Sequence, residues 1–186
     1  FQAAHALPDW HPAQLRQGET VRAWLGIDSG STTTKFVLMS EDEEILDAFY
    51  APNQGEPLDV AKRALLALRD RYRVAGAALD ILGVGTTGYG EQLFANAFSA
   101  ECHVVETVAH ARAAAKYVPN ATFLLDIGGQ DMKAIWLSHG VITNIVVNEA
   151  CSSGCGSFLE NFAASLHISV ERIAEEAFDA RHPACL

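Results

Sequence analysis

Two stretches of the sequence combine an aspartate, a turn of small or hydroxyl-bearing residues and a lysine. The first, LGIDSGSTTTK, carries Asp28 and Lys35, and the second, LLDIGGQDMK, carries Asp126 and Lys133. Glycine lets a backbone approach phosphate oxygens closely, and serine and threonine add hydroxyl donors. Carboxylates can orient a hydrated Mg²⁺, and lysine adds counter-charge. Each stretch is therefore a candidate for binding the phosphates of a nucleoside triphosphate.

An ordinary β-hairpin is the other interpretation of either stretch alone, because Asp-Gly and Gly-Gly pairs are common in hairpin turns. Both stretches, however, share the order of apolar strand, aspartate, turn, lysine and second strand. This internal repeat favours a binding role. Two such hairpins facing across a cleft would clamp a phosphate chain from both sides. Neither is a P-loop, because GxxxxGK[ST] does not occur.

The apolar periodicity predicts the elements that position these stretches. We expect strands at residues 23–28, 35–40, 44–51, 80–87, 102–106, 121–129, 130–138 and 141–147. We expect helices at residues 57–73, 89–98, 107–118, 157–166 and 170–180, the first opened by Pro57. The order is three strands, then helix and strand in alternation, and then a second set of three strands. Antiparallel strands at the start of a mixed sheet are the expected arrangement.

Composition limits the class of protein. The 186 residues are 49% hydrophobic with a formal net charge of -10 and no Lys/Arg-rich run, which argues against nucleic acid or an anionic membrane as the main partner. No apolar stretch approaches the roughly 18 residues of a membrane span, so we expect a cytoplasmic protein. Four cysteines are too few for a disulfide scaffold. We expect Cys102 to be a small core residue.

A further pair of residues that could do chemistry is Cys151 and Cys155, in the stretch NEACSSGCGSF. A disulfide is disfavoured in a cytoplasmic protein. The segment opens a helix, whose amides favour phosphate, thiolates or an anionic sulfide cluster. A plain helix entry, with Ser152 or Ser153 as cap and Cys155 in the core, is the remaining interpretation. Composition alone favours the helix entry, because one C-x3-C pair supplies two of the four ligands of a cluster.

The two phosphate stretches resemble those of the superfamily of acetate and sugar kinases, Hsp70 and actin. Within it, GVGTTGYG, VETVAHARAA, DIGGQDMKAI and NEACSSGCGSF are similar to motifs of the BadF/BcrA-type activators of 2-hydroxyacyl-CoA dehydratases. The resemblance spans about residues 24–180. It implies an α/β protein with the actin-like ATPase (ribonuclease H-like) fold, a mixed five-stranded sheet flanked by helices and an incomplete second lobe. Residues 1–22 carry Pro8, Pro12 and Gly18 without sustained periodicity, so we expect an irregular linker or lead-in there. By the resemblance, residues 23–120 would be the first lobe and 121–186 the start of the second.

The resemblance assigns site residues by position. The first phosphate motif is matched by Asp28, Gly30, Ser31, Thr32, Thr33 and Lys35, and the second by Asp126, Gly128, Gly129, Gln130, Asp131 and Lys133. Asp28 and Asp126 would hold Mg²⁺, and Gln130 would orient the attacking water. Asp131 is a candidate general base, but equally a ligand of metal or of an amide. Glu106 and His110 lie one helical turn apart and are either a catalytic pair or an ordinary helix-face pair.

The resemblance also changes the interpretation of the cysteines. Cys151 lies where these activators carry a ligand of a [4Fe-4S] cluster, which bridges two subunits of a homodimer. Cys155 lies where many relatives have threonine and is either a substitute ligand or a spectator. The second cluster cysteine of the family lies in a Cys-Thr-Val-Phe-like segment, which is absent, and Cys185 lacks the surrounding residues. We therefore expect a piece of a longer protein.

The predicted function is an ATPase domain of a dehydratase-activator-like protein, which couples ATP hydrolysis to electron transfer from the cluster. Its partners would be a second copy, a 2-hydroxyacyl-CoA dehydratase component and an electron donor such as ferredoxin or flavodoxin. One alternative is a sugar or small-molecule kinase, which needs a carboxylate base near the acceptor hydroxyl. The other is a nucleotide-sensing module without turnover.

Overall fold

The computed structural model describes residues 10–148 and 155–181 of the chain. The chain forms two compact units, Phe1–Glu106 and Thr107–Leu186, which are described separately. Helix α4 (Glu106–Tyr117) begins at this boundary and is described with the second unit. In the part of the chain that is described, no helix combines the length and the apolar content needed to cross a membrane.

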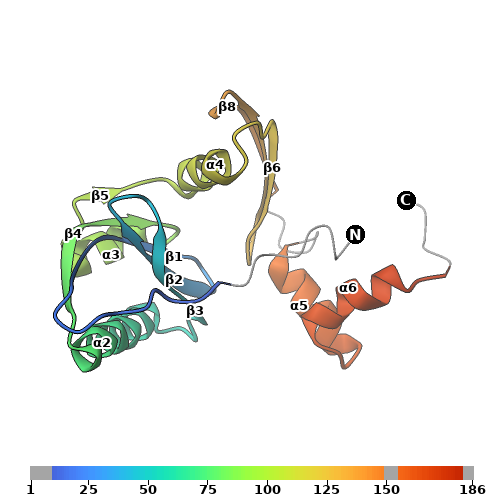
Figure 1. Ribbon diagram of the computed structural model, residues 1–186. Helices are drawn as coiled ribbons and strands as arrows, with labels where there is room; N and C mark the ends of the chain where they lie inside the picture. The colour runs from blue at the N-terminus through green and yellow to red at the C-terminus, as the bar shows by residue number, and fades with distance from the viewer. Residues whose placement is uncertain (1–9, 149–154, 182–186) are drawn as a thin grey trace. The chain divides into compact units, whose positions relative to one another are not determined.

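The first unit contains a five-stranded mixed sheet with the order β3-β2-β1-β4-β5 (Figure 1). Its strands are β1 (Thr20–Ser29), β2 (Thr33–Ser40), β3 (Ile45–Pro52), β4 (Ala78–Thr87) and β5 (Cys102–His103). The pairs β1–β2 and β2–β3 are antiparallel, whereas β1–β4 and β4–β5 are parallel. The expected antiparallel start of a mixed sheet is confirmed. The helices α2 (Pro57–Ala75) and α3 (Glu91–Phe98) complete the unit.

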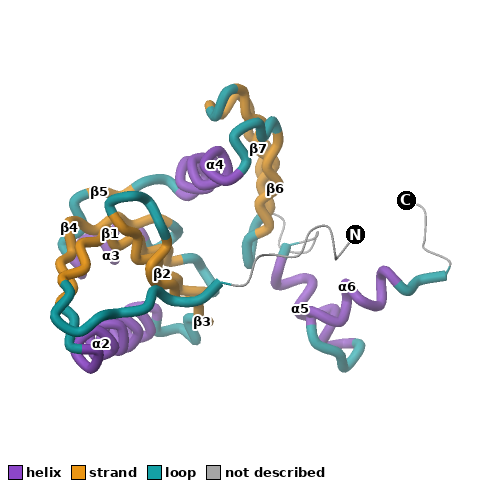
Figure 2. The backbone as a smooth tube through the Cα atoms, viewed as in Figure 1, coloured by secondary structure: helices purple, strands orange, loops and turns teal. Residues whose placement is uncertain are grey.

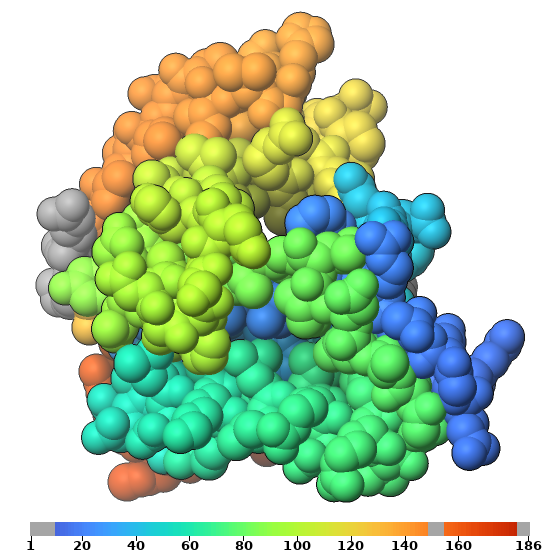
Figure 3. Space-filling view, turned by 90° about the vertical axis from the view of Figure 1, so that its left-hand side faces the viewer, coloured from blue at the N-terminus to red at the C-terminus, as the bar shows by residue number. Residues whose placement is uncertain are grey.

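Alternation along β1 builds the core of this unit. Ala23, Leu25 and Ile27 point inward and are buried. They share one buried cluster with Leu68 and Tyr72 of α2, which Pro57 opens as expected. The outward side of α2 forms the lower surface in teal and green in Figure 3. The ends of β1 and β2 next to the turn at Gly30 are thus fixed to a packed core.

Three expectations about this unit are wrong. Strand β1 begins at Thr20, inside the segment expected to be irregular, because residues 20–22 pair with residues 78–80 of β4. Strand β5 has two residues instead of five, since only Cys102 and His103 pair in register with β4. Cys102 is exposed and not a core residue. A short strand at the edge of the sheet has no neighbour on its outer side to cover it.

The second unit contains a three-stranded antiparallel sheet with the order β6-β7-β8. Figure 2 draws its strand segments in orange and labels β6 and β7. Its strands are β6 (Phe123–Ile127), β7 (Met132–Ser138) and β8 (Val141–Asn148), and its later helices are α5 (Gly156–Ser165) and α6 (Val170–Phe178). Ala111 of α4 packs with the buried Ile135 and Leu137 of β7. Leu124 joins this cluster from β6, so the side chain two residues on, Asp126, lies on the same face of the sheet.

Candidate nucleotide-binding site

In the first hairpin the aspartate and the lysine are direct partners across two strands. Asp28 ends the apolar part of β1 and stands opposite Lys35 of β2. The lysine Nζ lies 2.7 Å from Asp28 Oδ2. The amide of Gly30 donates to the carbonyl of Thr33 at 2.9 Å, which closes the turn between the strands. The sequence order of aspartate, turn and lysine is therefore a hairpin that brings the two charges together.

The second hairpin repeats this arrangement. Asp126 of β6 stands opposite Lys133 of β7, and the amide of Gly128 donates to the carbonyl of Asp131 at 2.9 Å. The spacing, the register and the turn hydrogen bond all match those of the first hairpin. The internal repeat seen in the sequence is thus a repeat in three dimensions. The lysines differ, because Lys133 Nζ lies 2.7 Å from Asp131 Oδ2 but 3.7 Å from Asp126 Oδ2.

One oxygen of Asp28 is left without a partner. Lys35 occupies Oδ2, while Oδ1 is buried and makes no hydrogen bond within the described residues. A buried carboxylate oxygen without a donor is costly, so such an oxygen suits a ligand that brings a cation or a bound water. The expected role of Asp28 as a Mg²⁺ ligand fits this chemistry.

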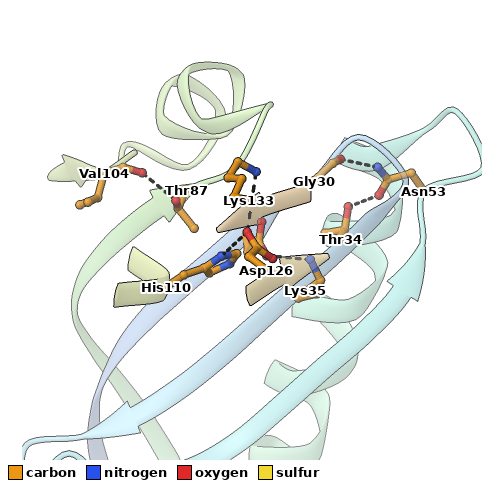
Figure 4. A network of polar contacts seen from close by, with 10 residues as sticks. Gly30, Thr34, Lys35, Asn53, Thr87, Val104, His110, Asp126 and Lys133 are labelled. Carbon is orange, nitrogen blue, oxygen red and sulfur yellow. Dashed lines mark hydrogen bonds and ion pairs between the residues drawn. The ribbon is translucent and has the colours of Figure 1, made fainter. Parts of the chain in front are cut away.

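Sequence reasoning missed Asn53, which holds the first turn in place. Its side-chain amide donates to the carbonyl of Gly30 at 2.9 Å, and its Oδ1 accepts from the Thr34 hydroxyl at 2.5 Å (Figure 4). Its backbone amide bonds the carbonyl of Thr32 at 2.8 Å. Asn53 is 5% exposed, so these bonds are protected from water. An asparagine after β3 gave no sequence signal for this role, because its partners lie about twenty residues earlier.

The glycines of GVGTTGYG had no role assigned from the sequence, and the structure supplies one. Residues 83–87 of this stretch are the end of β4, which runs parallel to β1, so the loop that begins at Gly88 emerges beside Asp28 and Ser29. A Cβ on Gly88 would lie 2.6 Å from Asp28 Oδ1, and a Cβ on Gly90 would lie 2.6 Å from the Ser29 hydroxyl. Gly88 also has a φ of +89°. The loop therefore packs directly against the candidate site, and only glycine fits at residue 88.

A histidine holds Asp126. His110 Nδ1 of α4 lies 2.9 Å from Asp126 Oδ2 (Figure 4). The hydrogen bond from His110, together with the charges of His110 and Lys133, lowers the pKa of Asp126 despite its burial. Glu106 stands one turn earlier on α4, and potential ligand atoms of Glu106, His110 and Asp126 lie within 4.8 Å of one another. The sequence left the role of Glu106 and His110 open, and the structure shows that His110 is a direct hydrogen-bond partner of Asp126.

The turn amides divide into two groups. Those of Gly30 and Gly128 are used in the turns, so these glycines permit close approach without donating to a ligand. Those of Ser31, Thr32 and Gly129 have no hydrogen-bond partner within the described residues. Ser31, Thr32 and Gln130 are exposed, while Thr33 begins β2. The exposed parts of the turns therefore present amides and hydroxyls to a ligand.

The start of α5 is bonded to the second hairpin. The amides of Gly156 and Ser157 donate to the carbonyls of Gly128 and Gly129 at 2.8 and 3.0 Å, and the Ser157 hydroxyl also donates to Gly129. The next two amides, of Phe158 and Leu159, bond the carbonyl of Cys155. The first amides of α5 are therefore already donated to backbone carbonyls. The alternative of a phosphate-binding loop at residues 151–155 stays a prediction, because residues 149–154 lie outside the described residues.

Of the two cysteines in the stretch NEACSSGCGSF, the structure describes Cys155. Cys155 is buried, 2% exposed, at the N-cap position of α5. The choice between a substitute cluster ligand and a spectator stays open for this residue. Cys151 and Cys185 lie outside the described residues.

Loss of the Ser157 hydroxyl should loosen the contact between α5 and the hairpin. We expect Ser157→Ala to cost about 1 kcal/mol of unfolding free energy, because a partly buried hydrogen bond is lost. Ser165→Ala is the matched control, since the Ser165 hydroxyl bonds the Phe162 carbonyl within the same helix at an exposed position. Urea denaturation measures both variants. Equal effects would contradict a stabilising contact specific to Ser157.

A model of the family described as "BadF/BadG/BcrA/BcrD ATPase family" matches residues 25–184. The (R)-2-hydroxyglutaryl-CoA dehydratase activating ATPase of Acidaminococcus fermentans is 31% identical over 151 residues, which is 81% of this chain and 56% of that protein. The activator of lactoyl-CoA dehydratase of Anaerotignum propionicum is 35% identical over 153 residues, again 81% of this chain and 56% of that protein. The chain spans little more than half the length of these relatives.

A solved structure confirms the fold. The activator of the 2-hydroxyisocaproyl-CoA dehydratase from Clostridium difficile with bound ADPNP matches with a TM-score of 0.73 and 27% identity, covering 87% of this chain and 59% of that chain. The expected α/β class and actin-like ATPase fold, with a mixed five-stranded sheet and flanking helices, are therefore correct.

Proposed function

Since the chain belongs to the BadF/BadG/BcrA/BcrD ATPase family, we propose that it binds and hydrolyses ATP with its two aspartate hairpins. The observation that carries this proposal is the repeated Asp–Lys pair, in which the protein holds Oδ2 of each aspartate and leaves the buried Oδ1 of Asp28 without a partner among the described residues. The bound ADPNP, an ATP analogue, in the related activator structure supports it.

We infer a division of roles among the hairpin residues. Asp28 and Asp126 would hold Mg²⁺, which would supply positive charge to the phosphates. The amides of Ser31, Thr32 and Gly129 would donate to phosphate oxygens. Gln130 would orient the attacking water. Asp131 is disfavoured as general base, because its carboxylate is already paired with Lys133 at 2.7 Å.

Hydrolysis of ATP by the purified protein tests this function. We expect Asp28→Asn and Asp126→Asn each to lower kcat by at least about 100-fold, the scale seen when one charge-stabilising group is removed from an active site. Asp42→Asn is the matched control, since Asp42 is exposed in the turn between β2 and β3. Unchanged hydrolysis in both hairpin variants would contradict the proposal.

We propose further that the complete protein is an activator of a 2-hydroxyacyl-CoA dehydratase or a related enzyme. The names of its relatives support this assignment. A [4Fe-4S] cluster shared between two copies would take Cys151 as a ligand, and a ferredoxin or flavodoxin would reduce it. The bonds from Gly156 and Ser157 to the second hairpin join the phosphate-binding turn to the helix that follows the cysteine stretch. Such a connection would let nucleotide state reach the cluster.

The cluster is tested by colour. Anaerobically purified full-length protein should be brown and should absorb visible light, and Cys151→Ala should remove both properties. Protein that stays colourless after reconstitution with iron and sulfide would contradict the cluster while leaving the ATPase proposal standing. Cys155→Ala, measured in parallel, separates a substitute ligand from a spectator.

A further inference from the structure

We propose that His110 is a positioning residue, which holds the carboxylate of Asp126 in the orientation needed at the second hairpin. The inference rests on the proposed function, because it gives Asp126 a role in the ATPase reaction. It assigns to His110 the task that Lys35 performs at Asp28 in the first hairpin.

The difference between the two lysines is the starting point. In the first hairpin, Lys35 Nζ lies 2.7 Å from Asp28 and serves as its direct partner. In the second hairpin, the equivalent Lys133 lies 2.7 Å from Asp131 and 3.7 Å from Asp126. The distance of 3.7 Å is too long for a good hydrogen bond. The repeat therefore leaves Asp126 without the close lysine contact that Asp28 has.

His110 fills that position from a different element. Its Nδ1 lies 2.9 Å from Asp126 Oδ2, the same oxygen that faces Lys133. An ionised carboxylate only accepts hydrogen bonds, so Nδ1 must carry the hydrogen and donate it. The contact joins a helix to a strand sixteen residues away, and a local helix-face pair cannot explain it.

Packing holds the histidine in place. The next residue, Ala111, is 3% exposed and packs with Ile135 and Leu137 of the same sheet. The helix cannot move away from β6 without opening this cluster. The side chains of His110 and Asp126 are 31% and 14% exposed, so the bond is partly shielded from water. When a fixed donor is hydrogen-bonded to Oδ2, the carboxylate cannot rotate freely and its Oδ1 keeps one orientation. A carboxylate that binds a metal needs such a fixed orientation.

Two substitutions separate positioning from mere packing. His110→Phe keeps the ring volume but removes the donor, and we expect it to lower kcat for ATP hydrolysis or raise the half-saturating Mg²⁺ concentration by about 10–100-fold, the range for groups that orient metal ligands. His110→Asn keeps a nitrogen donor close to the place of Nδ1 and should recover most of the loss. Thermal unfolding of each variant checks that it is folded.

Three outcomes would overturn the proposal. The first is a His110→Phe variant with unchanged kcat and Mg²⁺ dependence. The second is a His110→Asn variant as impaired as His110→Phe, although both are folded. The third comes from ¹⁵N NMR of the nucleotide-free protein, which should show the hydrogen of His110 on Nδ1. A hydrogen on Nε2 alone would remove the bond on which the proposal stands.

The NMR measurement also separates this proposal from the ATPase function. If the unaltered protein does not hydrolyse ATP, the proposed function fails, and the tautomer of His110 still shows whether it holds Asp126. If the protein hydrolyses ATP and the variants behave like the unaltered protein, only the role of His110 fails.

Discussion

Replacing Gly88 with alanine should cost about 3 kcal/mol of unfolding free energy and lower ATP hydrolysis. A Cβ at this residue would lie 2.6 Å from both Asp28 Oδ1 and the Ser29 carbonyl oxygen. Those contacts are too short to persist, and overpacking of this kind costs about 1–3 kcal/mol. The φ of +89° adds a further penalty of about 1–2 kcal/mol for a residue with a side chain.

Gly55→Ala is the matched control for this substitution. Gly55 has a φ of +81°, but a Cβ added there would meet no atom within 4 Å. Alanine at this residue therefore costs only the backbone strain of a positive φ. We expect a loss of about 1 kcal/mol and unchanged ATP hydrolysis. Urea denaturation gives the stabilities. If Gly88→Ala were no worse than Gly55→Ala, the loop would not be packed against Asp28 as described.

The hairpins were predictable because their information is local. Asp28, the turn and Lys35 are contiguous in the sequence, and a hairpin register then places the aspartate opposite the lysine. The second copy at Asp126 and Lys133 follows by the same reasoning. The long strands and α2 were likewise visible from periodicity, since alternation or a helical stripe persists over many residues.

The contacts between elements were not predictable, because no spacing rule connects them. Asn53 bonds Gly30, Gly88 packs on Asp28, and Ser157 bonds Gly129, and each pair is separated by at least twenty residues. His110 was singled out by its spacing from Glu106, but its partner on β6 could not be named. Strand β5 was overestimated, since an apolar run does not reveal how much of a neighbouring strand is available.

Replacing Lys133 with methionine should cost about 3 kcal/mol, far more than the same change at Lys35. The Lys133 side chain is 9% exposed and lies near two carboxylates, Asp131 at 2.7 Å and Asp126 at 3.7 Å. Removing the cation from a buried ion pair leaves uncompensated charge, which costs about 3–5 kcal/mol where both partners are fully buried. Asp131 is 35% exposed, so water offsets part of the loss and the lower end applies.

Lys35→Met is the matched control, because Lys35 occupies the same place in the other copy of the repeat. Its side chain is 34% exposed and it faces one carboxylate, so a loss of about 1 kcal/mol is expected. Without Lys133, the carboxylates of Asp131 and Asp126 have lost a nearby positive charge. Adding Asp131→Asn to Lys133→Met removes one of these two negative charges and should restore part of the stability. Urea denaturation of the three variants, beside the unaltered protein, measures these losses. Equal losses at the two lysines, or no recovery in the double variant, would mean that the charges around Lys133 do not control the stability of the second hairpin.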